Sequence, residues 1–222
     1  MLDFERDGAC IISTDTDPSD VLLLREEFEK LDFRAGVRTF HLSATAKRIL
    51  SVEGACGKAL AKLGKAHARP VRVLAFDKTP ASNWNLGWHQ DRVIAVKNKV
   101  DVTGFENWTV KSGITHVQPP AEIMSKLFTL RLHLDDCDAD NGALKVIPGS
   151  HKLGKLLDAQ VQNLAEQSEW SFCEAKTGEV LAMKTLAIHS SSPSRKPSHR
   201  RVLHVDYCES HLPDGLQWAL DW

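Results

Sequence analysis

Charged and apolar residues alternate at helical spacing in the first third of the chain. Residues 20–31, DVLLLREEFEKL, place apolar side chains three and four positions apart with charges between them, and residues 43–67 repeat this pattern. Ser43 starts the second run and belongs to the residue types that cap helix N-termini. The pattern predicts about two amphipathic helices and a mostly helical flank over residues 1–70.

After Pro70, short runs rich in β-forming residues alternate with turn residues. The turns include DADNG, PGS and SSPS, whose Gly, Pro, Asp, Asn and Ser residues favour reversal of the chain. Strands that succeed one another without a helix between each pair favour an antiparallel sandwich or jelly roll over a doubly wound α/β sheet. We therefore predict a mainly β protein with flanking helices and a jelly-roll core at residues 71–207. The predicted strands are residues 71–76, 127–135, 142–147, 180–189 and 201–207.

One long segment, residues 92–124, separates the first predicted strand from the others. Its polarity is mixed and its periodicity weak, and segments of this length in compact domains are usually lids, binding loops or disordered. Phe105 and Trp108 favour an ordered lid. Lys111 and His116 are expected at the surface of that lid.

Length, composition and charge indicate one globular domain over residues 1–222. The chain is 42% hydrophobic and 26% charged, with a net charge of -1 and no basic stretch, which does not favour nucleic acid as a partner. It has no run of about 18 apolar residues, so we expect no membrane span. The acidic start is unlike a secretion signal, and five scattered cysteines without a CxxC pair predict free thiols in the cytoplasm.

Three His-x-Asp pairs are the candidate metal-binding chemistry. In an extended strand residues i and i+2 point to the same side, so each pair presents an imidazole and a carboxylate, which are two ligands for a divalent metal. This spacing is common, and at least two of the pairs must have another role. The pairs are His89 with Asp91, His133 with Asp135, and His204 with Asp206.

A 2-His-1-carboxylate iron site needs a second histidine from another strand and open coordination positions. An arginine near such a site can hold a co-substrate carboxylate in bidentate fashion. His204 is followed only by His211 and by no arginine, which makes its pair a poor candidate. His189 and Arg200 meet both needs, but they can be combined with either of the other two pairs, so geometry alone leaves two candidates.

Three motifs in order resemble the phytanoyl-CoA dioxygenase family of Fe(II)- and 2-oxoglutarate-dependent oxygenases. The resemblance covers about residues 71–207 and implies a double-stranded β-helix, the cupin-like form of the jelly roll. The motifs are WHQD at 88–91, HLDDCDADNGALKVIPGSHKLG at 133–154 and HSSSPSRKPSHRRVL at 189–203, with weaker support from FERDGACII at 4–12.

The resemblance implies that His89, Asp91 and His189 bind Fe(II). It also implies that Arg200, eleven residues after His189, holds the distal carboxylate of 2-oxoglutarate, with Ser191 as a hydroxyl donor to it. The implied reaction uses O2 to hydroxylate a small-molecule substrate and releases succinate and CO2. Because related halogenases have a small residue where this chain has a carboxylate at position 91, we expect hydroxylation and not halogenation.

Other polar and aromatic residues are weaker candidates for the site. Lys78 could bind a co-substrate or substrate carboxylate, although a lysine at a strand end is more often solvated. Trp108, with Trp84 and Trp88, could wall the pocket, although buried tryptophans are core residues at least as often. Arg201 should face away from Arg200 if their strand is regular.

Alternation in residues 127–135 puts Thr129, Arg131, His133 and Asp135 on one face of a strand. If that face lines the barrel mouth, Arg131 could bind an anionic substrate group or the inner carboxylate of the co-substrate, with His133 behind the metal ligands. A salt bridge on an exposed sheet face is the alternative for Arg131.

The motifs leave the substrate open. No cluster of residues suits the nucleotide phosphates of coenzyme A, so we expect a free small molecule, such as an amino acid or another carboxylate, met by Arg131 or Lys78. Two rival functions also remain. One is a metal-dependent cupin-type enzyme that does not use 2-oxoglutarate and has no need of Arg200, and the other is a noncatalytic jelly roll that binds a small molecule. The sequence predicts no oligomeric state.

Overall fold

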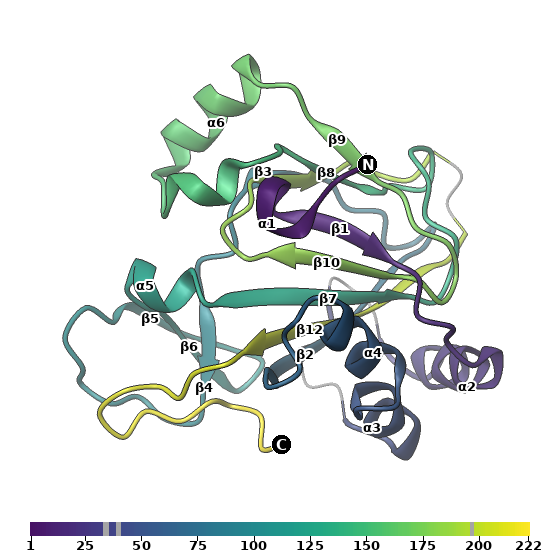
Figure 1. Cartoon of the computed structure of the whole chain (residues 1–222), viewed down its shortest axis with the longest axis horizontal. Helices are drawn as coiled ribbons and strands as arrows, with labels where there is room; N and C mark the ends of the chain where they lie inside the picture. Colours follow the sequence, from purple (N-terminus) through teal and green to yellow (C-terminus); the bar gives the residue numbers. More distant parts are fainter. Residues whose placement is uncertain (33–35, 39–40, 196–197) are drawn as a thin grey trace.

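The computed structural model describes residues 1–32, 36–38, 41–195 and 198–222, which form twelve strands in three sheets (Figure 1). Residues 196–197 of the third motif lie outside the described residues. The largest sheet has the order β1-β10-β7-β12-β2, and all of its neighbouring strands are antiparallel. Its strands are β1 (Ala9–Ile12), β2 (Arg69–Lys78), β7 (Leu127–His133), β10 (Val180–Lys184) and β12 (Arg200–Cys208).

A second sheet, with the order β3-β11-β8-β9, packs against the first through an apolar layer. Leu181 and Met183 of β10 meet Leu144 and Val146 of β8 in this layer. Two antiparallel sheets facing one another are the arrangement of a jelly roll, so the predicted fold class is confirmed. The strands of the second sheet are β3 (Leu86–His89), β8 (Leu144–Val146), β9 (Ser171–Cys173) and β11 (His189–Ser191).

The run at residues 180–189, predicted as one strand, is two strands in different sheets. β10 ends at Lys184, and the Ala187 amide donates to the Lys184 carbonyl at 3.0 Å in the turn that carries the chain to β11. The buried Thr185 hydroxyl donates to the carbonyls of Met124 and Leu127, which holds this turn. The apolar sequence continues through the turn because the turn is buried between the sheets.

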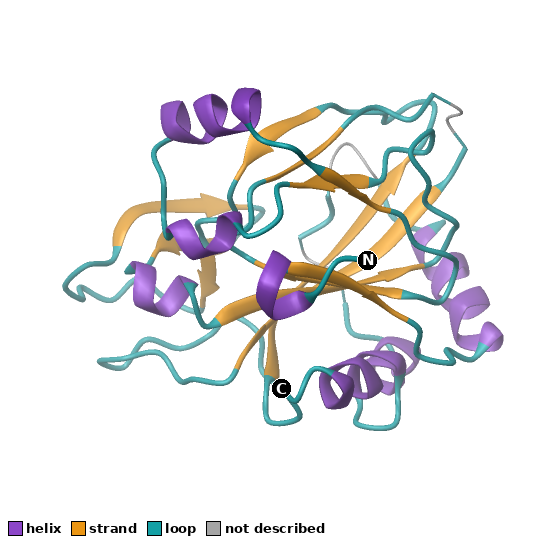
Figure 2. Ribbon diagram, turned by 45° about the horizontal axis from the view of Figure 1, so that its top comes forward, coloured by secondary structure: helices purple, strands orange, loops and turns teal. Residues whose placement is uncertain are grey.

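Helices cover the outer face of the largest sheet, and Figure 2 shows strands at the centre with helices around them. The predicted helical run at residues 43–67 is divided between α3 and α4. A Cβ at Gly54 would lie 2.0 Å from the Arg48 carbonyl oxygen, so only glycine allows the close turn between them. Ser43 caps α3 as predicted, because its hydroxyl accepts from the Ala46 amide at 3.0 Å. The helices of this flank are α1 (Phe4–Asp7), α2 (Pro18–Phe28), α3 (Ala44–Leu50) and α4 (Ala55–Lys62).

Residues 92–124 contain a third sheet, so this long segment has regular secondary structure, and its role as an ordered lid stays a prediction. The sheet has the order β4-β6-β5 and is followed by the short helix α5. Phe105 is buried in an apolar cluster with Ile94 and Val117 that also contains Val71 of β2 and Leu127 of β7, so the segment packs against the largest sheet. Its elements are β4 (Ile94–Val96), β5 (Glu106–Lys111), β6 (Ile114–Gln118) and α5 (Ala121–Met124).

Two further helices follow β8 in the chain. They are η1 (Ser150–Leu153), a 3₁₀ turn, and α6 (Asp158–Gln167). No helix among the described residues is long and apolar enough to cross a bilayer. All five cysteines are free thiols, as predicted.

Candidate metal centre and cavity

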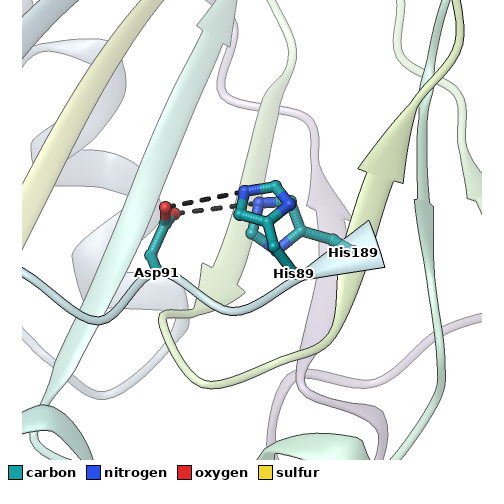
Figure 3. Close-up of side chains that lie close together, drawn as sticks. All are labelled: His89, Asp91 and His189. Atoms are coloured by element: carbon teal, nitrogen blue, oxygen red, sulfur yellow. Dashed lines mark ion pairs between the residues drawn. The ribbon is translucent and has the colours of Figure 1, made fainter. Parts of the chain in front are cut away.

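His89, Asp91 and His189 converge at one end of the second sheet (Figure 3). β3 and β11 are antiparallel neighbours, and their register sets His89 directly opposite His189. The Nε2 atoms of His89 and His189 each lie 3.8 Å from a different Asp91 carboxylate oxygen. Of the described residues, only these three form such a cluster of potential metal ligands, with ligand atoms within 4.8 Å of one another.

Backbone hydrogen bonds orient both imidazoles. The Nδ1 atoms of His89 and His189 lie 2.9 Å from the carbonyl oxygens of Gly87 and Ala187. A carbonyl oxygen can only accept, so each Nδ1 carries a proton, which leaves each Nε2 facing Asp91. Metal-binding histidines are usually held by such a bond on the other ring nitrogen.

The charges of the cluster suit a divalent cation. Burial, followed by the neighbouring His89, lowers the pKa of His189 to about 3 against the opposing effect of Asp91. Burial alone would raise the pKa of Asp91, but the positive charges of His189 and His89 outweigh it and keep the pKa below its usual range. The cluster therefore offers the Asp91 carboxylate and the neutral imidazole of His189, in the protonation states that metal binding requires.

The pair His204 and Asp206 does not point at the cluster. His204 Nε2 lies 2.8 Å from Asp206 Oδ1, and Arg72 Nε donates to the other Asp206 oxygen at 2.6 Å. All four polar side-chain atoms of this pair are bonded within the protein, because Arg131 Nη1 lies 3.0 Å from His204 Nδ1. Arginine can only donate, so His204 accepts at Nδ1 and donates to Asp206 through Nε2.

The pair His133 and Asp135 is divided between the two sides of the largest sheet, contrary to the predicted alternation. β7 ends at His133, and Asp135 turns outward to accept two bonds of 2.9 Å from the Arg201 guanidinium. Arg201 thus faces away from Arg200, as the regular strand predicted. His133 stays inside, where burial and then the charges of Arg131 and Arg200 lower its pKa to about 3.

Arg200, Lys78 and Ser191 meet at the opposite end of the cavity from Arg72. Register pairs Arg200 directly with Lys78 across β12 and β2. Lys78 Nζ donates to Ser191 Oγ at 2.8 Å, and both Ser191 and Arg200 donate to the Gly142 carbonyl oxygen, at 2.9 and 2.8 Å. Lys78 is only 1% exposed, so the general expectation of a solvated lysine is wrong here.

Gly142, of the DNGAL segment, is required by this arrangement. Its φ is 73°, in the left-handed region, and a Cβ there would lie 2.8 Å from the Ser192 carbonyl oxygen and 3.3 Å from Lys78 Nζ. The glycine therefore lets the backbone approach the lysine closely enough to present its carbonyl oxygen to Ser191 and Arg200.

Burial, and after it the positive charge of Arg200, lowers the pKa of Lys78 to about 7. In the unfolded chain this pKa is near 10.5, so between the two values the unfolded state binds more protons and the unfolding free energy rises with pH. We expect a rise of at most about 1.4 kcal/mol per pH unit between pH 7.5 and 8.5 in the ligand-free protein. Urea unfolding at both pH values measures it, and Lys78→Met should flatten the slope. Equal slopes in both proteins would contradict the assignment.

Arg131 is buried and forms part of the cavity wall. Its Nη1 donates a hydrogen bond to His204. Its Nε has no hydrogen-bond partner in the described part of the chain, and neither has either ring nitrogen of His133. The predicted alternative for Arg131, a salt bridge on an exposed sheet face, is wrong, because the residue is only 7% exposed.

A cavity of about 350 Å³ joins these groups. Its walls include the three clustered residues, Arg131, Arg200 and Ser191, and it extends to a group of basic residues that sequence reasoning missed, Arg38, Arg72, Lys111 and His116. His116 is 1% exposed, so its predicted surface position was wrong. Trp84 lines the cavity, whereas Trp88 and Trp108 pack against apolar clusters elsewhere. The alternation of Arg72, Leu74 and Phe76 in the sequence of β2 was the available signal for Arg72.

Comparison with known proteins agrees with the resemblance seen in the sequence. The profile of the family described as phytanoyl-CoA dioxygenase (PhyH) matches residues 4–202. No match was found among curated proteins.

Solved structures share the fold at low sequence identity. AviO1 from Streptomyces viridochromogenes Tue57 is 19% identical with a TM-score of 0.67, over 95% of this chain and 94% of that one. HygX from Streptomyces hygroscopicus, with nickel and 2-oxoglutarate bound, is 17% identical with a TM-score of 0.62, over 92% and 84%. SnoN, a non-haem α-ketoglutarate-dependent epimerase from nogalamycin biosynthesis, is 15% identical with a TM-score of 0.65, over 92% and 77%.

Proposed function

The chain belongs to the phytanoyl-CoA dioxygenase family, and from this premise we propose that it is an Fe(II)- and 2-oxoglutarate-dependent oxygenase that hydroxylates a small molecule. The reaction consumes O2 and releases succinate and CO2. One observation carries the proposal. The ligand set of His89, Asp91 and His189 opens into the same cavity as the buried guanidinium of Arg200.

The three clustered residues fit Fe(II). Two imidazoles and one carboxylate are the donor set of the facial triad in non-haem iron oxygenases, in which the remaining positions stay open. His89 and Asp91 each keep 28% of the side chain exposed, toward the cavity, while His189 is buried behind them. The site is therefore accessible from one side, as a co-substrate and oxygen require.

Arg200 and its neighbours fit the distal carboxylate of 2-oxoglutarate. Arg200 is 2% exposed, and its Nε lacks a hydrogen-bond partner among the described residues. A buried guanidinium donor without a partner is costly, which a bound carboxylate would relieve. Ser191 would donate its hydroxyl to the same carboxylate in place of the Gly142 carbonyl, and Lys78 would add a second positive charge beside it.

The residues of the chain provide binding, orientation and exclusion of water. Iron and 2-oxoglutarate, when bound, supply with O2 the oxidising power for attack on a C–H bond. Asp91 occupies the position that a halide would need, which supports hydroxylation as the outcome. His204 stays neutral, because burial lowers its pKa despite Asp206, and it holds the Arg131 guanidinium at the cavity wall.

The rival functions fit the structure less well. A cupin-type enzyme that does not use 2-oxoglutarate has no ligand for the buried Arg200. A noncatalytic binding protein leaves both Arg200 and the cluster of metal-binding residues unexplained. SnoN, which shares the fold, is an epimerase and therefore gives a different reaction outcome. The product of the reaction is for this reason tested separately from the cofactors. A cytoplasmic location stays a prediction.

The decisive experiment is an anaerobic titration of the metal-free protein with Fe(II) and then with 2-oxoglutarate. A weak visible metal-to-ligand charge-transfer band is expected when the 2-oxo acid chelates the iron, and His189→Ala should remove it. Iron binding without the band would favour the cupin-type rival. Absence of iron binding would reject the metal site, and a product that has gained no oxygen atom would reject hydroxylation.

A further inference from the structure

Four basic residues gather at the end of the cavity far from Arg200. They come from three separate parts of the fold. One follows Val37, which forms a β-bridge with Ala75 of β2, one lies on β2 itself, and two lie on the hairpin of β5 and β6. We call them the basic rim: Arg38, Arg72, Lys111 and His116.

Strand geometry separates the basic rim from the proposed co-substrate site. Arg72 and Lys78 lie on the same strand, six residues apart, which corresponds to about 20 Å along an extended strand. The neighbouring strand repeats this spacing, because Arg200 pairs with Lys78 and Asp206 pairs with Arg72. A five-carbon diacid spans only a fraction of this length, so the carboxylate that it places at Arg200 lies away from Arg72.

The basic rim carries more positive charge than its carboxylates neutralise. Asp206 accepts from both Arg72 and His204, and no carboxylate among the described residues pairs with Arg38 or Lys111. Burial, followed by the charges of Arg72, Lys111 and Arg38, lowers the pKa of His116, which places all three cations near its ring. A surplus of cations inside a cavity attracts an anion.

The cavity wall between the basic rim and the Lys78 end of β2 is apolar and aromatic. Leu74 and Phe76 follow Arg72 at alternate positions of β2, and Trp84 and Val93 also line the cavity. The cavity volume of about 350 Å³ is at the small end for ligand pockets. It suits a small molecule with an apolar body beside the co-substrate.

We propose that the substrate is a small molecule with an oxyanion, a carboxylate or a phosphate, that binds the basic rim while its apolar body lies along Leu74, Phe76 and Trp84. This proposal rests on the proposed function, because it takes the metal cluster as the place of reaction. The rim then sets the distance between the anionic group and the carbon that is hydroxylated. Neutral molecules of the same shape bind poorly.

Two small probes test the rim directly, inorganic phosphate and propionate, with propionamide as the neutral analogue of propionate. Calorimetry measures their binding to the anaerobic complex with Fe(II) and 2-oxoglutarate. We expect at least one anion to bind and propionamide not to bind, and the tighter anion identifies phosphate or carboxylate as the group recognised. The double variant Arg38→Gln/Lys111→Gln should weaken that anion at least about tenfold.

Lys99→Gln is the matched control, because it removes an exposed lysine outside the cavity wall, near Trp108. It should leave anion binding unchanged. The charge-transfer titration of each variant checks that the fold and 2-oxoglutarate affinity are intact. Absence of anion binding, or equal binding by the double variant, would overturn the proposal. A loss of 2-oxoglutarate affinity in the double variant would also overturn the proposal, because the rim would then bind the co-substrate. Absence of the band in the unmutated protein would instead reject the proposed function.

Discussion

Asp91→Ala is expected to abolish succinate formation and to weaken Fe(II) binding by at least about 100-fold. Removal of this side chain takes away the only negative charge of the cluster and leaves two imidazoles, of which His189 has a pKa near 3 and is neutral. Loss of a residue that only supports a metal ligand costs 10- to 100-fold in affinity, and loss of a ligand should cost more. Anaerobic calorimetry with Fe(II) and a succinate assay measure the two effects.

Asp206→Asn is the control for Asp91→Ala. Asp206 is also a buried carboxylate two residues after a histidine, but its oxygens are bonded to His204 and Arg72. We expect iron binding to be preserved and the protein to be less stable, because the charged partner of Arg72 is lost. Asparagine keeps the shape of the side chain and so limits the risk of misfolding. Loss of iron in the Asp206 variant and not in the Asp91 variant would mean that the wrong pair was chosen.

Arg200→Ala is expected to weaken 2-oxoglutarate binding by roughly 30-fold or more, since truncating one partner of a buried charge pair costs about 2–5 kcal/mol. The guanidinium is 2% exposed and is held by the Gly142 carbonyl at 2.8 Å, so its orientation is set before a ligand arrives. Arg200→Lys should recover part of the affinity, because it restores the charge without the bidentate geometry. Titration of the charge-transfer band and the KM for 2-oxoglutarate both measure this loss.

Arg201→Gln is the matched control for Arg200→Ala, one residue along the same strand. Arg201 points out of the cavity to Asp135, so its loss should lower the stability of the protein and leave 2-oxoglutarate binding unchanged. Full activity of the Arg200→Ala variant would favour the cupin-type enzyme that has no use for 2-oxoglutarate. A similar loss of affinity in both variants would point to a general effect on the strand and not to a carboxylate site.

Most strands of the largest sheet were predictable because their signals are local, whereas β1 lies in the segment predicted as a mostly helical flank. Alternation and turn residues give β2, β7 and β12 to within a few residues, although β2 extends to Lys78 and β7 stops at His133. β5 was missed because most of Glu106–Lys111 is exposed on both faces, which leaves no alternation to read. The turn between β10 and β11 was missed for the opposite reason, since it is buried and, apart from Thr185, apolar.

The basic rim and the burial of Lys78 could not be read from the sequence. Arg38, Arg72 and Lys111 lie more than thirty residues apart in the chain and meet only because three elements pack around one cavity. Each of them alone is indistinguishable from a solvated surface residue. Lys78 is at the end of a strand, and it is the close approach of Gly142 that covers it.

By itself, the sequence determined that the chain is a mainly β jelly roll of the phytanoyl-CoA dioxygenase family, because strand periodicity, turn residues and motif order are properties of neighbouring positions. The motif resemblance already implied the pair of His89 and Asp91, but spacing alone left the choice open, and only the tertiary structure shows which pair meets a second histidine. All three pairs have the same spacing, but Asp135 turns outward at the end of β7, and Asp206 accepts a hydrogen bond from Arg72. Pairing of β3 with β11 alone brings His89 and Asp91 to His189, and such pairing depends on contacts a hundred residues apart in the chain.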